Sequence, residues 1–165
     1  MGNEISYSAR PEFKEIEMSN GLTSVFVSVT SLAMSSIAEE DWQRRFAAWF
    51  ASHDQFAFGS GMVGFDVGCL PWSSSNLQDE RAFVLRGIDA ALTKTGWERL
   101  KYSPREESIN ECLTAFRKII ESFASEHICE DNSKVWALMD KPETFRLCST
   151  HVVYKHDCGC PVCND

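Results

Sequence analysis

The fold is decided by the stretch Ser103-Pro104-Arg105-Glu106-Glu107-Ser108-Ile109-Asn110-Glu111-Cys112-Leu113-Thr114-Ala115-Phe116-Arg117-Lys118-Ile119-Ile120-Glu121-Ser122-Phe123. Ser103 is suited to cap a helix, with Pro104 in the first turn and Glu106 as the capping-box partner. Apolar side chains recur at helical spacing on one face: Ile109, Cys112, Leu113, Phe116, Ile119, Ile120 and Phe123. Because burying one such side chain stabilises a fold by about 1.5–3 kcal/mol, this helix is predicted to be the centre of the core.

Two more helices are predicted upstream. Asn76 can begin a helix that ends before Gly96. Ser36, with Glu39 as its capping-box partner, begins another that runs to about Ser52. The second of these carries an aromatic stripe at helical spacing, which is typical of a core-facing side: Trp42, Phe46, Trp49 and Phe50.

The segment from Leu22 to Met34 is ambiguous. Its valines alternate as in a strand, yet its apolar residues also follow helical spacing, with serines 24, 28, 31 and 35 on the opposite side. We favour the helix. Residues 1–18 are polar with scattered apolar positions and are predicted to be a lead-in. The expected fold is therefore mainly α, a compact multi-helix domain over residues 1–145.

The last twenty residues carry the chemistry of a metal site. Four of the seven cysteines and two of the four histidines lie between positions 148 and 163. Cys148 and His151 form one pair with a two-residue spacer, and Cys160 and Cys163 form another. Such a spacer lets one tight turn supply two ligands, and thiolate and imidazole are ligands that Zn²⁺ prefers.

The turn chemistry of the second pair agrees with this interpretation. Pro161 sets φ after the first ligand, and Asn164 tolerates the left-handed conformation that often follows the second. This Cys-Pro-x-Cys half resembles a rubredoxin-type zinc knuckle, and the resemblance covers about the last sixteen residues. We predict a small hairpin holding a structural Zn²⁺, formed by residues 146–165 and packed on the helical domain.

Alternatives to this ligand set stay open. His156 and Cys158 are spare donors inside the hairpin, and either can replace His151. Cys158 and Cys160 can also be ordinary reduced thiols in a frayed tail, or two cysteines can pair as a disulfide in an exported protein. Finally, the apolar run 152–154 can be a core strand with cysteines around it by chance.

Charge and composition narrow the classes of partner and the compartment. The net charge of −8 disfavours nucleic acid and anionic membranes, since phosphate binding is driven by Lys and Arg. No apolar run approaches the twenty residues of a membrane span. The first residues lack the order of a signal peptide, and an odd number of cysteines does not suit a closed disulfide framework. We expect a cytoplasmic protein; its oligomeric state is left open.

Two stretches are candidates for contact with a partner. Gly59–Gly64 spells the dinucleotide fingerprint, but Pro71 argues against the helix that must follow it, so no nucleotide site is predicted. The loop after it either presents Asp66 and Trp72 to a partner or is pinned to the core by its aromatic residues. The stretch 105–131 carries seven acidic and three basic residues, and its last acidic residues are the other candidates: Glu126, Glu130 and Asp131.

The sequence points to binding, with no reaction of its own. Four ligands close together, three of them thiolates, describe a closed structural site, whereas a catalytic zinc keeps an open position. The other His pairings, His53 with Asp54 and His127 with Cys129, are interpreted as surface polar groups. We therefore expect no enzyme, but a protein-binding module for a basic protein partner.

A resemblance of type gives this module a narrower interpretation. The acidity, the helical composition and the Gly-Phe-Asp…Leu-Pro-Trp loop (residues 64–72) resemble immunity proteins of bacterial polymorphic and contact-dependent toxin systems. The resemblance implies tight binding to a cognate toxin. The first alternative is a regulatory or scaffold protein with a structural zinc, and the second is a zinc-dependent enzyme.

Overall fold

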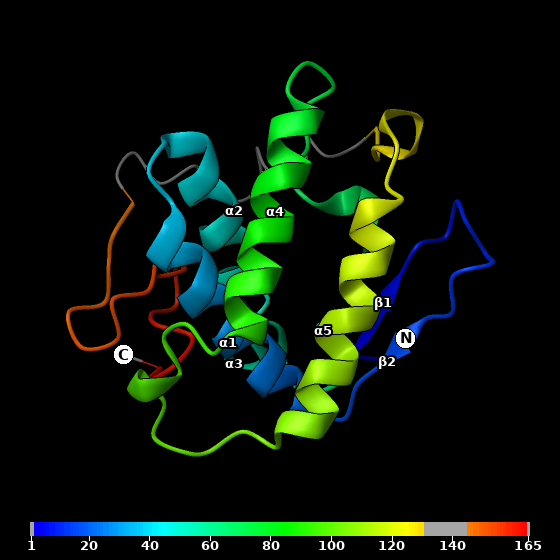
Figure 1. The fold of residues 1–165 in the computed structure, drawn as a ribbon. Coiled ribbons are helices and arrows are strands. Elements are labelled where there is room, and N and C mark those ends of the chain that lie inside the picture. Colours follow the sequence, from blue (N-terminus) through cyan, green and yellow to red (C-terminus); the bar gives the residue numbers. More distant parts are fainter. Residues whose placement is uncertain (1, 131–144, 165) are drawn as a thin grey trace.

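The computed structural model describes residues 2–130 and 145–164 (Figure 1). The described part contains five helices: α1 (Asn20–Ile37), α2 (Asp41–Ser52), α3 (Gln55–Phe58), α4 (Leu77–Leu92) and α5 (Glu106–Glu121). It also contains three short strands, β1 (Glu4–Ser6), β2 (Ile16–Glu17) and β3 (Phe65–Asp66), and three 3₁₀ turns, η1 (Val67–Cys69), η2 (Trp97–Arg99) and η3 (Ser125–His127). The predicted mainly α architecture is confirmed.

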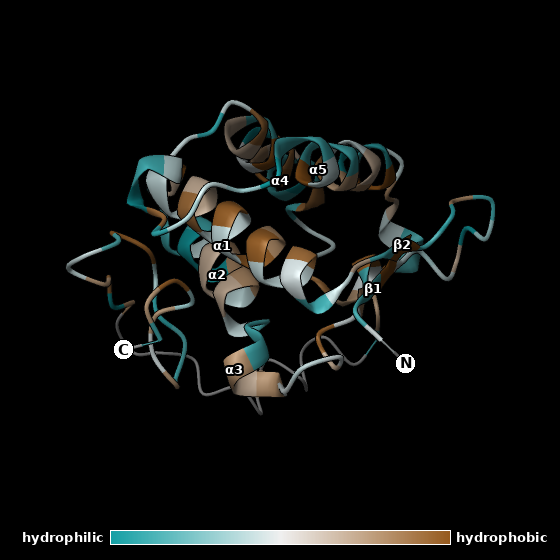
Figure 2. Ribbon diagram, turned by 90° about the horizontal axis from the view of Figure 1, so that it is seen from below, coloured by the Kyte–Doolittle hydropathy of each residue, from teal (hydrophilic) through white to brown (hydrophobic). Residues whose placement is uncertain are grey.

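Helix α1 occupies the centre of the fold. Figure 2 shows α4 and α5 as one layer over α1 and α2, with α3 below them, and α1 packs against α2, α4 and α5. Its residues from Phe26 to Met34 are all buried, including Ser28, Thr30 and Ser31. The prediction that the 103–123 helix holds the centre is wrong, because α5 buries one face only, whereas α1 is buried all round between Phe26 and Met34.

The ambiguous segment 22–34 is therefore a helix, as favoured. Its length and apolar composition would also suit a membrane span, but 56% of α1 is buried inside the protein, which is the pattern of a core helix. Helix α4 crosses α1 at very close range at Gly87. A Cβ on Gly87 would lie 2.7 Å from Cγ of Met34, so a larger residue there would force the Met34 side chain to move.

Two predicted helix starts are displaced. Ser36 does not begin α2; its hydroxyl donates to Leu32 O at 2.8 Å inside α1. The capping box at α2 belongs instead to Glu40 and Gln43. Helix α5 begins at Glu106 without a side-chain cap. Its N-cap is Arg105 and not the predicted Ser103, and the Glu106 carboxylate forms an ion pair with Lys94 at 2.6 Å.

The lead-in interpretation of residues 1–18 is wrong. They form β1 and β2, which join β3 in a sheet of order β2-β1-β3, with β1 antiparallel to β2 and parallel to β3. Ile5 and Tyr7 are buried in the main core. Strands of two and three residues are too short to give a readable alternation, and that is why the sequence did not reveal them.

Candidate metal centre

Four ligand atoms meet in the C-terminal tail, residues 146–165. Cys148, His151, Cys160 and Cys163 each offer one donor atom, and these atoms all lie within 4.8 Å of one another. Nδ1 of His151 is 3.6 Å from Sγ of Cys148 and 3.7 Å from Sγ of Cys160, and Sγ of Cys148 is 3.9 Å from Sγ of Cys163. The first three side chains are buried and Cys163 is half-buried. This metal cluster can hold one ion.

Two turns of the same backbone shape build the cluster. In the first, Val152 N donates to Cys148 O at 2.8 Å; in the second, Asn164 N donates to Cys160 O at 2.8 Å. The residue closing each turn is left-handed, with φ 52° at Val152 and 61° at Asn164. Each turn thus supplies two ligands at the same positions, and the expectation of a left-handed Asn164 is confirmed.

Backbone amides of these turns are directed at the sulfurs. Burial alone would raise the pKa of Cys148, but hydrogen bonds from His151 and Thr150 outweigh it and lower the pKa to about 6. At Cys160, burial prevails over the amides of Cys163 and Val162 and, with the neighbouring thiols, raises the pKa to about 12. A cation bound at the centre would reverse the effect of the neighbouring sulfurs, because a coordinated thiol is deprotonated.

The tail docks on the serine-bearing side of α1. A short antiparallel pairing of Leu147 with Tyr154 forms the hairpin. Leu32 of α1 packs in one apolar cluster with Cys148, Val153 and Cys160. Tyr154 N donates to Oγ of Ser35 at 3.1 Å, and Arg44 Nε of α2 donates to the Tyr154 hydroxyl at 3.0 Å. The tail therefore packs on the polar side of α1 and shields much of that side from water.

The two spare donors lie away from the cluster. His156 Nε2 is 3.2 Å from Oδ2 of Asp54, and His156 Nδ1 accepts from Cys158 N at 3.1 Å. Both of these side chains, His156 and Asp54, are buried, while Cys158 is exposed. His156 therefore clamps the tail to the start of α3, where Asp54 is the N-cap. No sequence signal connects these two residues.

The residues interpreted as surface polar groups have other roles. Asp54 is buried, and the ring of His53 lies on that of Trp49, with centroids 3.9 Å apart. His53 Nδ1 is 2.8 Å from Trp49 O, and burial lowers the His53 pKa to about 4. His127 Nδ1 is bonded to the Tyr7 hydroxyl at 2.7 Å. The surface interpretation of the His53–Asp54 pair is therefore wrong.

The predicted partner residues are scattered. Asp66 lines a cavity of about 330 Å³ at the sheet and accepts hydrogen bonds from Ser8 N and Gly68 N. Trp72 is only 6% exposed, and its Nε1 donates to Val67 O at 2.8 Å, so its side chain pins the loop to the core. Glu126 and Glu130 are exposed, and Asp131 lies outside the described residues.

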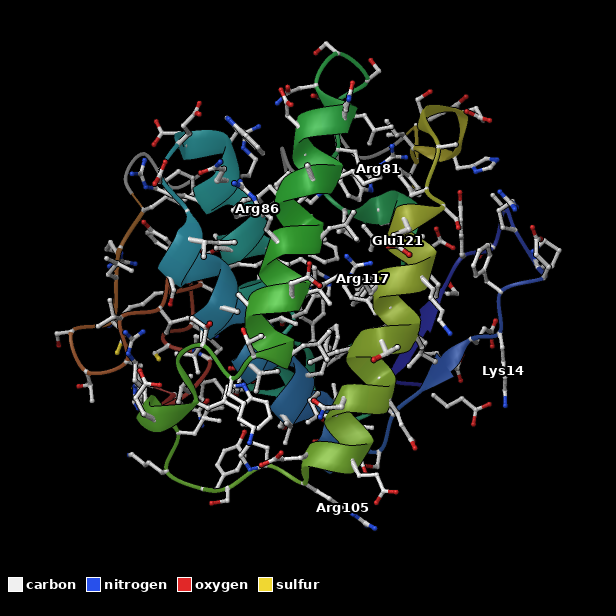
Figure 3. All side chains as sticks on the ribbon, in the orientation of Figure 1. Lys14, Arg81, Arg86, Arg105, Arg117 and Glu121 are labelled. Atoms are coloured by element: carbon white, nitrogen blue, oxygen red, sulfur yellow. The ribbon has the colours of Figure 1, made fainter. Side chains whose placement is uncertain are left out.

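Ion pairs neutralise part of the negative charge that the composition of the α5 stretch predicts. Figure 3 shows Arg117 between α4 and α5, where it pairs with Asp89 at 2.7 Å and with Glu121. Lys94 pairs with Glu106. Among the described residues, Glu126 and Glu130 after the helix have no ion-pair partner.

The division of the chain at residue 145 stays a prediction. Tyr154 of the tail belongs to the main apolar core, and its ring lies 6.0 Å from that of Phe145. The tail and the helices therefore share apolar contacts across the predicted boundary.

Comparison with protein-family models, with curated proteins and with solved structures gave no match. The resemblance to immunity proteins therefore has no support beyond composition.

Proposed function

We propose that the tail binds one Zn²⁺ through Cys148, His151, Cys160 and Cys163 as a closed structural site. The observation that carries this proposal is the repetition of one ligand-bearing turn, with the same hydrogen bond and the same left-handed closing residue, on both sides of the cluster. Thiolate and imidazole donors select zinc over oxygen-seeking cations such as Ca²⁺ and Mg²⁺.

The ligand set favours a structural ion over a catalytic one. Four protein donors fill the tetrahedral coordination of Zn²⁺, and a catalytic site leaves one position for water or substrate. Three thiolates with a neutral imidazole also leave the ion a net charge of about −1, which makes it a poor Lewis acid. The role that remains is to fix the hairpin on α1.

Metal analysis tests this part of the proposal. Purified protein is expected to contain about one zinc per chain, and the double variant Cys160→Ser/Cys163→Ser is expected to lose it. Cys158→Ser is the matched control, because Cys158 lies in the same tail and outside the cluster; it is expected to keep the metal. Zinc-free wild-type protein with unchanged stability would contradict the proposal.

We further propose that the protein acts as a binding module for a basic protein partner. The net charge of −8 favours such a partner. The cavity at the sheet is lined by Glu4, Glu15 and Asp66, with no lysine or arginine among the described residues around it. Met62, which also lines the cavity, is 68% exposed. Apolar groups beside carboxylates suit a partner that offers both basic and apolar side chains.

A cognate toxin is the narrower form of this proposal, and a regulatory or scaffold role is its alternative. A toxin gene beside this one would favour the first, and its purified product is then the partner to test. Charge-steered association is expected to slow several-fold when Glu126 and Glu130 are reversed to lysine, and to slow in the wild type as salt rises. Insensitivity to both changes, with a strong effect of Met62→Ser, would place the contact at the sheet cavity. Turnover of a substrate that depends on a zinc ligand would overturn the binding-module proposal.

A further inference from the structure

A second pair of cysteines lies far from the metal cluster. Sγ of Cys69, at the end of η1, is 3.0 Å from Sγ of Cys129, which follows η3. The two residues are sixty positions apart in the sequence. Cys129 N also donates to Gly68 O at 3.1 Å, so the two backbones are joined beside the sulfurs.

The surroundings hold this pair in place. A Cβ on Gly68 would lie 2.5 Å from His127 O and 3.2 Å from Sγ of Cys129, which means that the two segments pack as closely as backbone allows. On one side, the Tyr7 hydroxyl bonds Nδ1 of His127 at 2.7 Å. On the other, the ring of Trp72 stacks on Phe123, with centroids 5.0 Å apart. The proximity of the sulfurs therefore follows from the packing of both segments.

We propose that Cys69 and Cys129 form a reversible intrachain disulfide by exchange with a low-molecular-weight disulfide. One cysteine, as its thiolate, attacks a sulfur of the small disulfide; a mixed disulfide forms, and the small thiol leaves with a proton. The second cysteine, having lost its proton, attacks the mixed disulfide at the protein sulfur and releases the second small thiol. The two protein thiols are oxidised, and one small disulfide is reduced to two thiols.

The other cysteines of the described part lack this arrangement. Cys112 is buried against Met18, with Sγ 3.6 Å from Sδ, and Cys158 is exposed, with no second thiol beside it among the described residues. The remaining three belong to the metal cluster. Closing the Cys69–Cys129 bond requires the sulfurs to approach by about 1 Å, since a disulfide is about 2.05 Å long. This displacement is within the reach of two half-buried side chains.

The surroundings of Cys69 and Cys129 determine how fast the disulfide forms and which segments it joins. Burial, together with the Cys129 thiol, raises the pKa of Cys69 to about 12. The Cys69 thiolate is therefore scarce at neutral pH, and attack by this sulfur accelerates with rising pH. The bond would fasten η1, which follows Asp66, to the segment after α5. This inference does not depend on the zinc site or on a partner.

The experiment uses the full chain with its tail intact. The protein is incubated with oxidised glutathione at pH 8.5, free thiols are alkylated, and the intact mass and the non-reduced peptides are analysed by mass spectrometry. We expect a loss of two hydrogens, a single cross-linked peptide pair joining Cys69 to Cys129, and full reversal by dithiothreitol. Because the closed loop is long, the thermal midpoint is expected to rise by roughly 10 °C.

Two variants complete the test. Cys158→Ser is expected to form the same cross-link, and Cys69→Ser is expected to stop at a glutathione adduct on Cys129. Zinc is measured in parallel, so that oxidation of the metal cluster is recognised separately. A wild-type protein that gains glutathione only at Cys158, or that cross-links a tail cysteine instead, would overturn the proposal.

Discussion

Replacing Val152 with asparagine is expected to tighten metal binding. Val152 closes the first turn of the metal cluster at φ 52°, a conformation that costs an L-residue with a Cβ roughly 1–2 kcal/mol and is worst for β-branched side chains. Asn164 occupies the equivalent place in the second turn at φ 61°, and asparagine adopts this conformation more readily. Val152 is 43% exposed, so a polar side chain is accommodated.

The expected gain follows from this comparison. If the change removes most of the strain, the folded tail becomes more stable by about 1 kcal/mol. Since folding of the site and binding of the metal are linked, zinc affinity rises by roughly fivefold. The measurement is competition with a chromogenic chelator at fixed pH. The reciprocal variant Asn164→Val is expected to weaken binding by a similar factor.

A matched control separates strain from polarity. Thr150 is exposed, lies in the same turn and is not left-handed. Because most surface substitutions have small effects, Thr150→Asn is expected to change the zinc affinity by less than about twofold. Unchanged or weaker binding in Val152→Asn, with Thr150→Asn neutral, would refute the argument that the first turn stores strain.

The remaining predictions concern the ligands, the docking of the tail and pH. His151→Ala is expected to abolish tight zinc binding, while His156→Ala leaves a bound ion but loosens the tail, because His156 holds Asp54; equal losses of zinc would contradict this assignment. Leu32→Ala should lower the free energy of unfolding by about 2–5 kcal/mol and also weaken zinc binding, whereas Val29→Ala, buried in the same helix but outside the tail cluster, should affect stability alone. His53 has its pKa lowered by burial from 6.5 to about 4, so the stability that it contributes is complete above pH 6.5 and is lost as pH falls toward 4. Between pH 7 and 4.5 this loss is about 2.5 kcal/mol, measurable by urea unfolding, and His53→Gln should lack it; an identical pH dependence in the variant would refute the assignment.

The ligand turns were readable from the sequence because their chemistry is local. Two-residue spacing, Pro161 and Asn164 define a turn without any knowledge of the rest of the fold. The choice of His151 over His156 was not local. It depends on Asp54, which lies 102 residues from His156 and draws it away from the cluster. Spacing alone therefore predicted the four residues that meet in the cluster, but it left His156 and Cys158 open as replacements for His151.

The sequence of helix α1 did not reveal that the tail packs on its serine-bearing side. Periodicity distinguishes apolar from polar sides, and a row of serines suggests a side that faces water. The same row also suits a docked segment with backbone donors, and Tyr154 N finds Ser35 Oγ in this way. Hydroxyl groups satisfy either water or a neighbouring backbone, so the pattern does not tell the two apart.

The position of the tail on α1 connects the proposed zinc to the stability of the whole protein. Leu32 contributes to the tail cluster from the helix that α2, α4 and α5 surround. An ion that holds Cys148 and Cys160 therefore also fixes the cover of Leu32, and removing it exposes apolar surface of the central helix. Chelation should then lower the stability of the helical part as well as detach the tail. The sequence-based division at residue 145 predicts that the helical part stays folded when the tail detaches. Thermal unfolding with and without a chelator measures how much stability the helical part loses, and global unfolding on chelation would contradict the division.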